Sequence, residues 1–143
     1  MILKVYIDGA SRKNPGEAGA GIFMEDNAGM ALAELNEYLG ITTNNEAEYK
    51  ALIIALKYII NNIGNNSLIQ LNEIKFFSDS LLLVKQMKGE YSVKSPNIIP
   101  LYREAKSLSK MVASHCSFTH IPREQNKRAD SLANLAIDDV SRC

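Results

Sequence analysis

The sequence predicts one α/β domain built on a mixed five-stranded sheet, with helices packed on its faces. Three observations lead to this prediction. The chain has 143 residues, a usual size for one domain, and 46% of them are hydrophobic. Segments with the patterns of strands and of helices follow one another in the order βββαβααβα. Neither an internal repeat nor a linker divides the chain, so we expect residues 1–143 to form a single domain.

The N-terminal part of the chain is expected to supply three strands. They are residues 2–8, 18–25 and 29–38. The second and third strands form an antiparallel hairpin, because the sequence from Asp26 to Gly29 between them has the composition of a turn.

The longest predicted helix spans residues 44–62, and Gly64 marks its end. Its apolar side chains recur at helical spacing and cover the helix almost all round, so we expect this helix to be central in the fold. Residues 73–78 are the fourth predicted strand. A short helix follows from about Ser80 to Met87.

The C-terminal part is expected to contain two more helices and one strand. Ser95 is suited to cap a helix whose first turn holds Pro96. Residues 115–121 are the fifth predicted strand. The last helix is predicted from about Gln125 to Ile137, with its alanines and Leu132 facing inward.

Charge and hydropathy limit the possible functions. Lysine and arginine together number 16, as do aspartate and glutamate, so the net charge is zero. This balance counts against a protein that binds DNA by charge alone, but less against an enzyme whose acidic cluster is neutralised by cations. No apolar stretch approaches the ~20 residues that span a bilayer. The apolar start also lacks the basic region of a signal peptide, so we expect a cytoplasmic protein with no membrane partner.

The two cysteines, Cys116 and Cys143, lack the spacing of a metal site. Free thiols are the expected state in an intracellular protein. A disulfide between them that ties down the C-terminus stays open as the alternative.

Four acidic residues lie at the edges of different predicted elements. Asp8 and Asp79 end strands, Glu48 lies near the start of the long helix, and Asp130 lies near the start of the last helix. A carboxylate that ends a buried strand is costly to desolvate unless a cation meets it. Carboxylates that arrive in this way from remote parts of the sequence suggest one shared divalent metal. Oxygen ligands without a cysteine or histidine cluster favour Mg²⁺ or Mn²⁺ over zinc.

Four sequence blocks resemble the signature blocks of type 1 ribonuclease H. The blocks are Asp8 to Gly16, Thr43 to Tyr49, Ser78 to Ser80 and His120 to Asp130, in the family's order and at its spacing. The resemblance covers essentially the whole chain and implies the ribonuclease H-like fold. It also implies a metal-dependent endoribonuclease that hydrolyses the RNA strand of RNA–DNA hybrids. Nothing in the sequence indicates an obligate oligomer, so we expect a monomer.

The resemblance further implies a two-metal mechanism. Two ions about 3.5–4 Å apart can activate the attacking water and relieve the charge on the transition state and on the leaving 3′ oxygen. Asp8 is expected to bridge both ions, and Glu48, Asp79 and Asp130 complete the site. The expected ions are Mg²⁺, with Mn²⁺ as a substitute. The expected products carry 5′-phosphate and 3′-hydroxyl ends.

The second block contains two glutamates, of which one is the expected ligand. Glu46 and Glu48 point about 200° apart on a helix, so the two side chains do not face the same site. Thr43 followed three residues later by Glu46 fits a capping box. Glu48 lies on the side of the buried helix residues, and the family motif places its ligand before Tyr49. We therefore interpret Glu48 as the ligand and Glu46 as structural.

The first block supplies part of a predicted substrate-binding set. Gly9 is expected to let the backbone approach the substrate closely, and a plain turn glycine is the alternative. Ala10 and Ser11 follow in the same block and are included in the set.

Four polar residues resemble further substrate contacts of the family. Asn44 and Asn45 match residues that contact bases and the RNA 2′-hydroxyl, although one of the two is also expected to cap the helix. Asn14 and Thr43 match positions that hold a phosphate of the DNA strand. Turn formation is the alternative for that pair.

Two residues compete for the catalytic-loop role. His120 lies ten residues before Asp130, which is the spacing of the family's loop histidine. The alternation of Phe118, His120 and Pro122 is typical of a strand, however, and would hold His120 in the sheet. We therefore favour Arg123 over His120 for product release or phosphate positioning.

Two further departures from the family concern the substrate surface. The segment from Lys88 to Pro100 is too short for the basic protruding helix of some members, and the chain has no tryptophan, so we expect modest affinity for the hybrid. Leu81 stands where some relatives carry a polar contact residue. Two other functions stay open, namely a related nuclease that also cuts double-stranded RNA and an inactive nucleic-acid-binding module.

Overall fold

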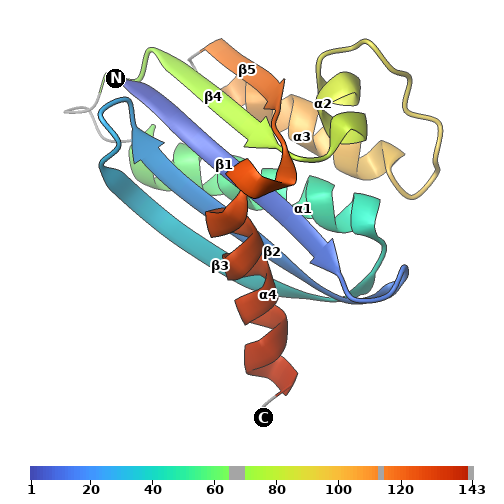
Figure 1. The fold of residues 1–143 in the computed structure, drawn as a ribbon. Coiled ribbons are helices and arrows are strands. Elements are labelled where there is room, and N and C mark those ends of the chain that lie inside the picture. Colours follow the sequence, from blue (N-terminus) through green and yellow to red (C-terminus); the bar gives the residue numbers. More distant parts are fainter. Residues whose placement is uncertain (65–69, 113–114, 142–143) are drawn as a thin grey trace.

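The computed structural model describes residues 1–64, 70–112 and 115–141 (Figure 1). The order of its main elements is the predicted βββαβααβα. The elements are β1 (Ile2–Ser11), β2 (Gly16–Asp26), β3 (Ala31–Thr42), α1 (Asn44–Tyr58), the π-helical turn η1 (Ile59–Ile63), β4 (Glu73–Ser78), α2 (Leu81–Met87), α3 (Ile99–Met111), β5 (His115–His120), the 3₁₀ turn η2 (Arg123–Gln125) and α4 (Lys127–Ser141).

The five strands form one mixed sheet in the order β3-β2-β1-β4-β5. β1 pairs antiparallel with β2, and β2 pairs antiparallel with β3, so the predicted hairpin is confirmed. β4 runs parallel to both β1 and β5. The carboxyl ends of these three parallel strands therefore meet at one edge of the sheet. Asp8, near the end of β1, and Asp79, directly after β4, lie at that edge.

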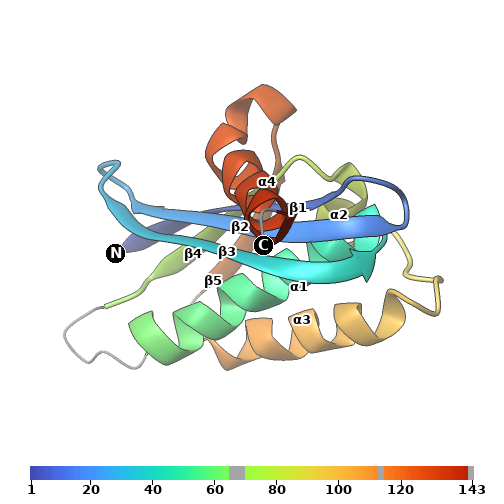
Figure 2. The same cartoon turned by 90° about the horizontal axis from the view of Figure 1, so that it is seen from below.

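Helices cover both faces of the sheet (Figure 2). α1 and α3 lie on one face, whereas α4 crosses the other. The main core lies between the sheet and α1, as predicted for the longest helix. Its largest fully buried side chains include Leu3, Ile7, Tyr49, Leu52, Leu56 and Phe76.

A glycine lets α4 lie against the centre of the sheet. A Cβ atom on Gly21 would be 2.0 Å from the Ala129 carbonyl oxygen, a distance that no real side chain tolerates. The backbone of α4 therefore packs directly on β2. This close contact fixes where the first turn of α4, and with it Asp130, stands relative to the sheet.

Two predicted helix starts are wrong. α3 begins at Ile99, not after Ser95, because the Ser95 carbonyl accepts the Ile98 and Ile99 N–H groups and closes a separate turn. α4 begins at Lys127, because the preceding residues form η2. The long helix reaches residue 63, but its last five residues are π-helical.

Two other sequence-based expectations concern membrane spans and the cysteines. Within the described residues, no helix is both long and apolar enough to cross a membrane. Cys143 lies outside them, so the expectation of free thiols, with a disulfide between Cys116 and Cys143 as its alternative, stays a prediction.

Candidate active site

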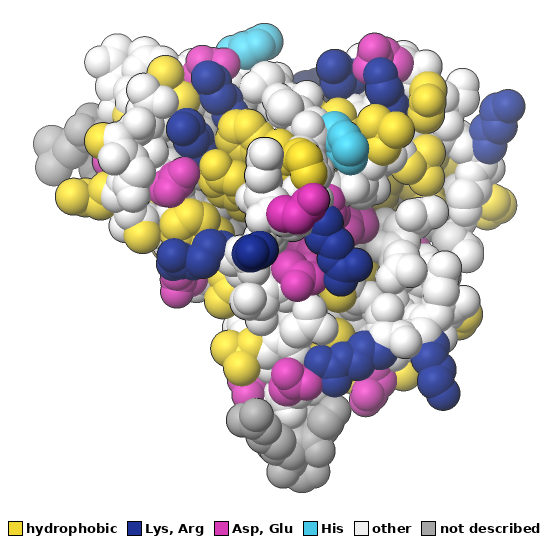
Figure 3. All heavy atoms as spheres, viewed as in Figure 1, with side chains coloured by type: hydrophobic (Ala, Val, Ile, Leu, Met, Phe, Trp, Pro, Cys, Tyr) yellow, Lys and Arg dark blue, Asp and Glu magenta, His cyan; other side chains and the backbone are white. Residues whose placement is uncertain are grey.

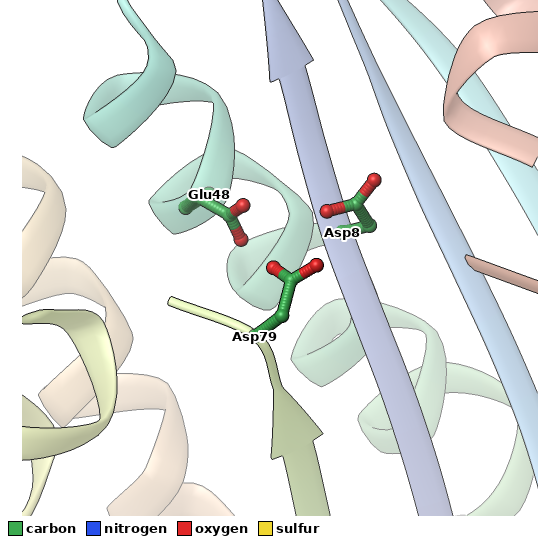
Figure 4. Close-up of side chains that lie close together, drawn as sticks. All are labelled: Asp8, Glu48 and Asp79. Atoms are coloured by element: carbon green, nitrogen blue, oxygen red, sulfur yellow. The ribbon is translucent and has the colours of Figure 1, made fainter. Parts of the chain in front are cut away.

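Three carboxylates from different elements meet at the edge of the sheet (Figure 4). Asp8 comes from β1, Glu48 from the second turn of α1, and Asp79 from the residue after β4. Each offers an oxygen atom that lies within 4.8 Å of the others. Their side chains line a cleft of about 560 Å³. The sequence predicted this meeting, and the parallel pairing of β1 with β4 explains it.

Asp130 lies in the same cleft but outside this group of three. It stands in the first turn of α4 and shares a hydrogen bond with Asp8. The Asn134 amide donates to its Oδ1 at 3.3 Å, and Arg123 Nη2 lies 3.9 Å from the same oxygen. Acidic side chains consequently gather beside the start of α4, flanked by Lys and Arg side chains (Figure 3).

The clustered carboxylates are held in an unfavourable environment. Burial, together with the charges of the neighbouring Asp79 and Asp130, raises the pKa of Asp8 to about 8. Burial and the charge of Asp8 likewise raise the pKa of Glu48 well above its ordinary value. Desolvation also raises the pKa of Asp79, although Arg123 opposes this effect. Each shift shows that the ionised form lacks sufficient positive charge nearby.

A divalent cation fits this group of oxygens. Glu48 Oε2 is buried and has no hydrogen-bond partner, while a hydrogen bond from the Gly9 backbone stabilises the ionised form of the Glu48 carboxylate. A buried, unpartnered carboxylate oxygen is costly unless it meets a cation. The donors are all oxygen atoms, which suits Mg²⁺ or Mn²⁺ rather than zinc.

The two glutamates of the second block have separate surroundings. Thr43 caps α1, because its hydroxyl accepts the Glu46 N–H at 3.2 Å and donates to the Glu46 carboxylate at 2.9 Å. The predicted capping pair is therefore confirmed, and Glu46 is outside the cleft lining. The expectation that Asn44 or Asn45 caps the helix is wrong, because Thr43 holds that position.

Gly9 is buried within β1, so the turn interpretation is wrong. A Cβ atom on Gly9 would be 2.1 Å from the Ala47 carbonyl carbon, so the missing side chain lets α1 approach β1. This approach brings Glu48 beside Asp8. Gly9 also lines the cleft, where its predicted substrate contact stays a prediction.

The other predicted substrate contacts divide into two groups. Ala10, Ser11 and Asn44 line the cleft, whereas Asn14, Thr43 and Asn45 are outside its lining. Asn14 Oδ1 accepts the Asn44 N–H at 3.0 Å, and Asn44 Oδ1 accepts the Ser11 N–H at 3.1 Å. These bonds join the β1–β2 loop to the start of α1.

Both candidates for the loop role line the cleft. His120 ends β5, which confirms that it is held in the sheet, and its side chain is exposed. Arg123 lies in η2 with 80% of its side chain exposed. The sequence interpretation missed Asn126 and Asn134, although each is four residues from Asp130 and thus one helical turn away.

The mixed sheet is that of the ribonuclease H-like class of proteins, because solved structures of ribonucleases H superpose on it with a TM-score of 0.87. The family model described as reverse transcriptase-like matches residues 6–136. Ribonuclease HI of Halobacterium salinarum is 38% identical over 94% of this chain. The bifunctional protein Rv2228c of Mycobacterium tuberculosis is 37% identical over 99% of it. The chain spans 64% and 37%, respectively, of the lengths of these two relatives.

A solved structure supports the same assignment. The crystal structure of LC11-RNase H1 in complex with RNA/DNA hybrid superposes with a TM-score of 0.87 and is 38% identical, covering 96% of this chain and 98% of that one. The chain belongs to the reverse transcriptase-like family and, within it, to the type 1 ribonucleases H.

Proposed function

We propose that the protein is a divalent-metal-dependent endoribonuclease that hydrolyses the RNA strand of RNA–DNA hybrids. The observation that carries the proposal is the meeting of Asp8, Glu48 and Asp79, with one Glu48 oxygen buried and unpartnered. A similar protein has been crystallised with an RNA/DNA hybrid. An inactive binding module would leave this cluster of raised-pKa carboxylates without a purpose.

The residues present fit two Mg²⁺ ions, with Mn²⁺ as a substitute. Asp8 would contact both ions, because it lies beside Glu48 and Asp79 and also shares a hydrogen bond with Asp130. Such ions, when bound, supply positive charge at the phosphodiester and lower the pKa of water. The products of this chemistry are 5′-phosphate and 3′-hydroxyl ends.

The protein's own groups prepare the cleft for this reaction. Gly9 allows α1 to approach β1, and its backbone bond stabilises the Glu48 carboxylate. The Arg123 guanidinium, 3.9 Å from Asp130, places a fixed positive charge where a phosphate enters the cleft. Arg123 serves this purpose better than His120, because its charge is independent of pH.

Recognition of the RNA strand falls to the cleft wall formed by Ser11 and Asn44. The side-chain amide oxygen of Asn44 accepts the Ser11 N–H. The NH₂ group of the same amide can therefore donate hydrogen bonds to a substrate. A 2′-hydroxyl distinguishes RNA from DNA at such a contact. Asn14 helps to hold the start of α1, because its side-chain oxygen accepts the Asn44 N–H.

A strand-resolved cleavage assay tests the proposal. The protein is incubated with a labelled hybrid, double-stranded RNA, double-stranded DNA and single-stranded RNA, each with Mg²⁺, Mn²⁺ or EDTA. We expect cutting of the hybrid's RNA strand only, and no cutting in EDTA. Equal cutting of the DNA strand, or undiminished activity in EDTA, would refute the proposal. Efficient cutting of double-stranded RNA would favour the broader nuclease.

A further inference from the structure

Asn126 is a buried polar residue at the junction of η2 and α4, and the proposed chemistry gives it no role. Its side chain is 1% exposed. Its Nδ2 donates to the Ile7 carbonyl oxygen at 2.9 Å. Ile7 directly precedes Asp8, so this bond joins the segment before α4 to the strand that carries Asp8.

The backbone of Asn126 is hydrogen-bonded to two residues that line the cleft. Its carbonyl oxygen accepts the Asp130 N–H at 3.0 Å, and its own N–H donates to the Arg123 carbonyl at 3.0 Å. One residue is therefore bonded to the segments that carry Asp8, Asp130 and Arg123. Only the bond to Ile7 depends on the identity of the side chain.

This side-chain hydrogen bond lies just beyond the point where β1 stops pairing with β4. The parallel pairing of β1 with β4 ends at Tyr6 and Phe77, one residue before Ile7. Asn126 supplies a donor just beyond that end. The bond thus ties the end of β1 to the first turn of α4, directly beside the acidic cluster.

The amide gives the fold little net stability. Its Oδ1 is buried and lacks a hydrogen-bond partner, so the cost of desolvating that oxygen offsets the gain from the bond made by Nδ2. A buried amide whose N–H group is hydrogen-bonded but whose oxygen is not calls for an explanation other than stability, and we look for it in the position of the groups that the amide joins.

We propose that Asn126 is a positioning residue that fixes the separation between Asp8 and Asp130, so that both carboxylates reach the same metal cluster. The inference rests on the proposed function. A misplacement of about 1 Å between catalytic groups lowers turnover by about 100-fold. Loss of the amide is therefore expected to act on the chemical step and on metal affinity rather than on substrate affinity.

The test compares Asn126→Ala with Gln86→Ala. Gln86 is a matched control because it is also a buried amide, 6% exposed, that accepts the Tyr49 hydroxyl at 2.7 Å and donates to the Ser92 carbonyl at 3.3 Å. It lies outside the cleft lining. Both variants remove a buried hydrogen-bonding amide, but only Asn126→Ala removes the link to β1.

Two readouts are measured at a temperature where both variants are folded. In steady-state cleavage of the hybrid, Asn126→Ala should lower kcat about 100-fold with KM changed less than about threefold, while Gln86→Ala keeps wild-type kcat. In a substrate-free Mn²⁺ titration followed by electron paramagnetic resonance, Asn126→Ala should bind Mn²⁺ several-fold more weakly than Gln86→Ala.

The inference is overturned if Asn126→Ala and Gln86→Ala have the same kcat and the same Mn²⁺ affinity. If Asn126→Ala does not fold, Asn126→Ser replaces it, because its short side chain keeps a polar atom but lacks the reach to Ile7. A wild-type protein that binds Mn²⁺ but leaves the hybrid intact would refute the proposed function alone, since the Mn²⁺ titration still measures the positioning effect.

Discussion

Replacing Asp8 with asparagine is expected to stabilise the metal-free protein while it removes most nuclease activity. Asp8 is 5% exposed and lies beside Glu48, Asp79 and Asp130. A neutral amide of the same shape relieves the repulsion among these carboxylates. The same amide is a poor substitute for a carboxylate that is expected to contact two ions, so cleavage should fall by orders of magnitude.

The size of the stabilisation follows from the pKa of Asp8. Burial and the neighbouring carboxylates raise this pKa from 3.8 to about 8. Each pH unit between these two values corresponds to about 1.4 kcal/mol, so at pH 7 the carboxyl costs the fold at most about 4 kcal/mol. Because the buried carboxylates share the repulsion and only one is removed, we expect a gain of about 1–2 kcal/mol. That gain corresponds to an increase in Tm of roughly 3–8 °C.

The sign of the pH dependence is fixed by the direction of the shift. Below about pH 4 the Asp8 carboxyl is protonated in both the folded and the unfolded protein, so it costs the fold nothing. Its cost grows as the pH rises from about 4 towards 8. The advantage of Asp8→Asn should therefore be absent near pH 4 and largest near pH 8.

Thermal unfolding followed by circular dichroism in EDTA measures this effect. Asp138→Asn is the matched control, because it removes a half-buried carboxylate that is 2.6 Å from Arg12 and should bring no gain. Mg²⁺ should stabilise the wild type more than the Asp8 variant, since it binds the native carboxylates. A marked fall in the Tm of Asp8→Asn in EDTA near pH 8, or a gain that does not vary with pH, would refute the reasoning.

Five further substitutions probe the neighbouring residues. Glu48→Gln should lower turnover by orders of magnitude in a cleavage assay. Glu46→Gln should cost about 1 kcal/mol of stability or less and leave turnover nearly unchanged. The reverse result would show that Glu46, and not Glu48, is the ligand. Arg123→Ala should lower turnover more than His120→Ala, and a larger loss with His120→Ala would transfer the loop role to the histidine. Gly9→Ala should destabilise the fold by about 1–3 kcal/mol in urea unfolding, because its Cβ would be 2.1 Å from the Ala47 carbonyl carbon, and an unchanged midpoint would contradict that close approach.

The features that the sequence predicted correctly are those with a regular period or a direct topological consequence. The order of strands and helices follows from apolar periodicity and turn residues, and it agrees with the structure throughout the described residues. The meeting of Asp8 and Asp79 follows from the parallel pairing of β1 with β4. The separation of Glu46 from Glu48 follows from helix geometry and the Thr43 cap.

The features that the sequence did not predict depend on the local course of the backbone or on contacts between distant segments. Ser95 and Pro96 have the composition of a helix start, but the backbone closes a separate turn there before α3 begins. Gly9 resembles a turn glycine until the backbone of Ala47 is placed against it. The bond from Asn126 to Ile7 spans 119 positions of the sequence, so no local pattern indicates it.

The most direct test of the account is the location of a bound metal ion. Crystals of the wild-type protein soaked with Mn²⁺ would show the ion by its anomalous scattering. We predict a peak in contact with Asp8, Glu48 and Asp79, with Glu48 Oε2 as one of its ligands. Mn²⁺ that binds only elsewhere on the protein, at concentrations that support cleavage, would contradict the claim that these carboxylates form the metal site.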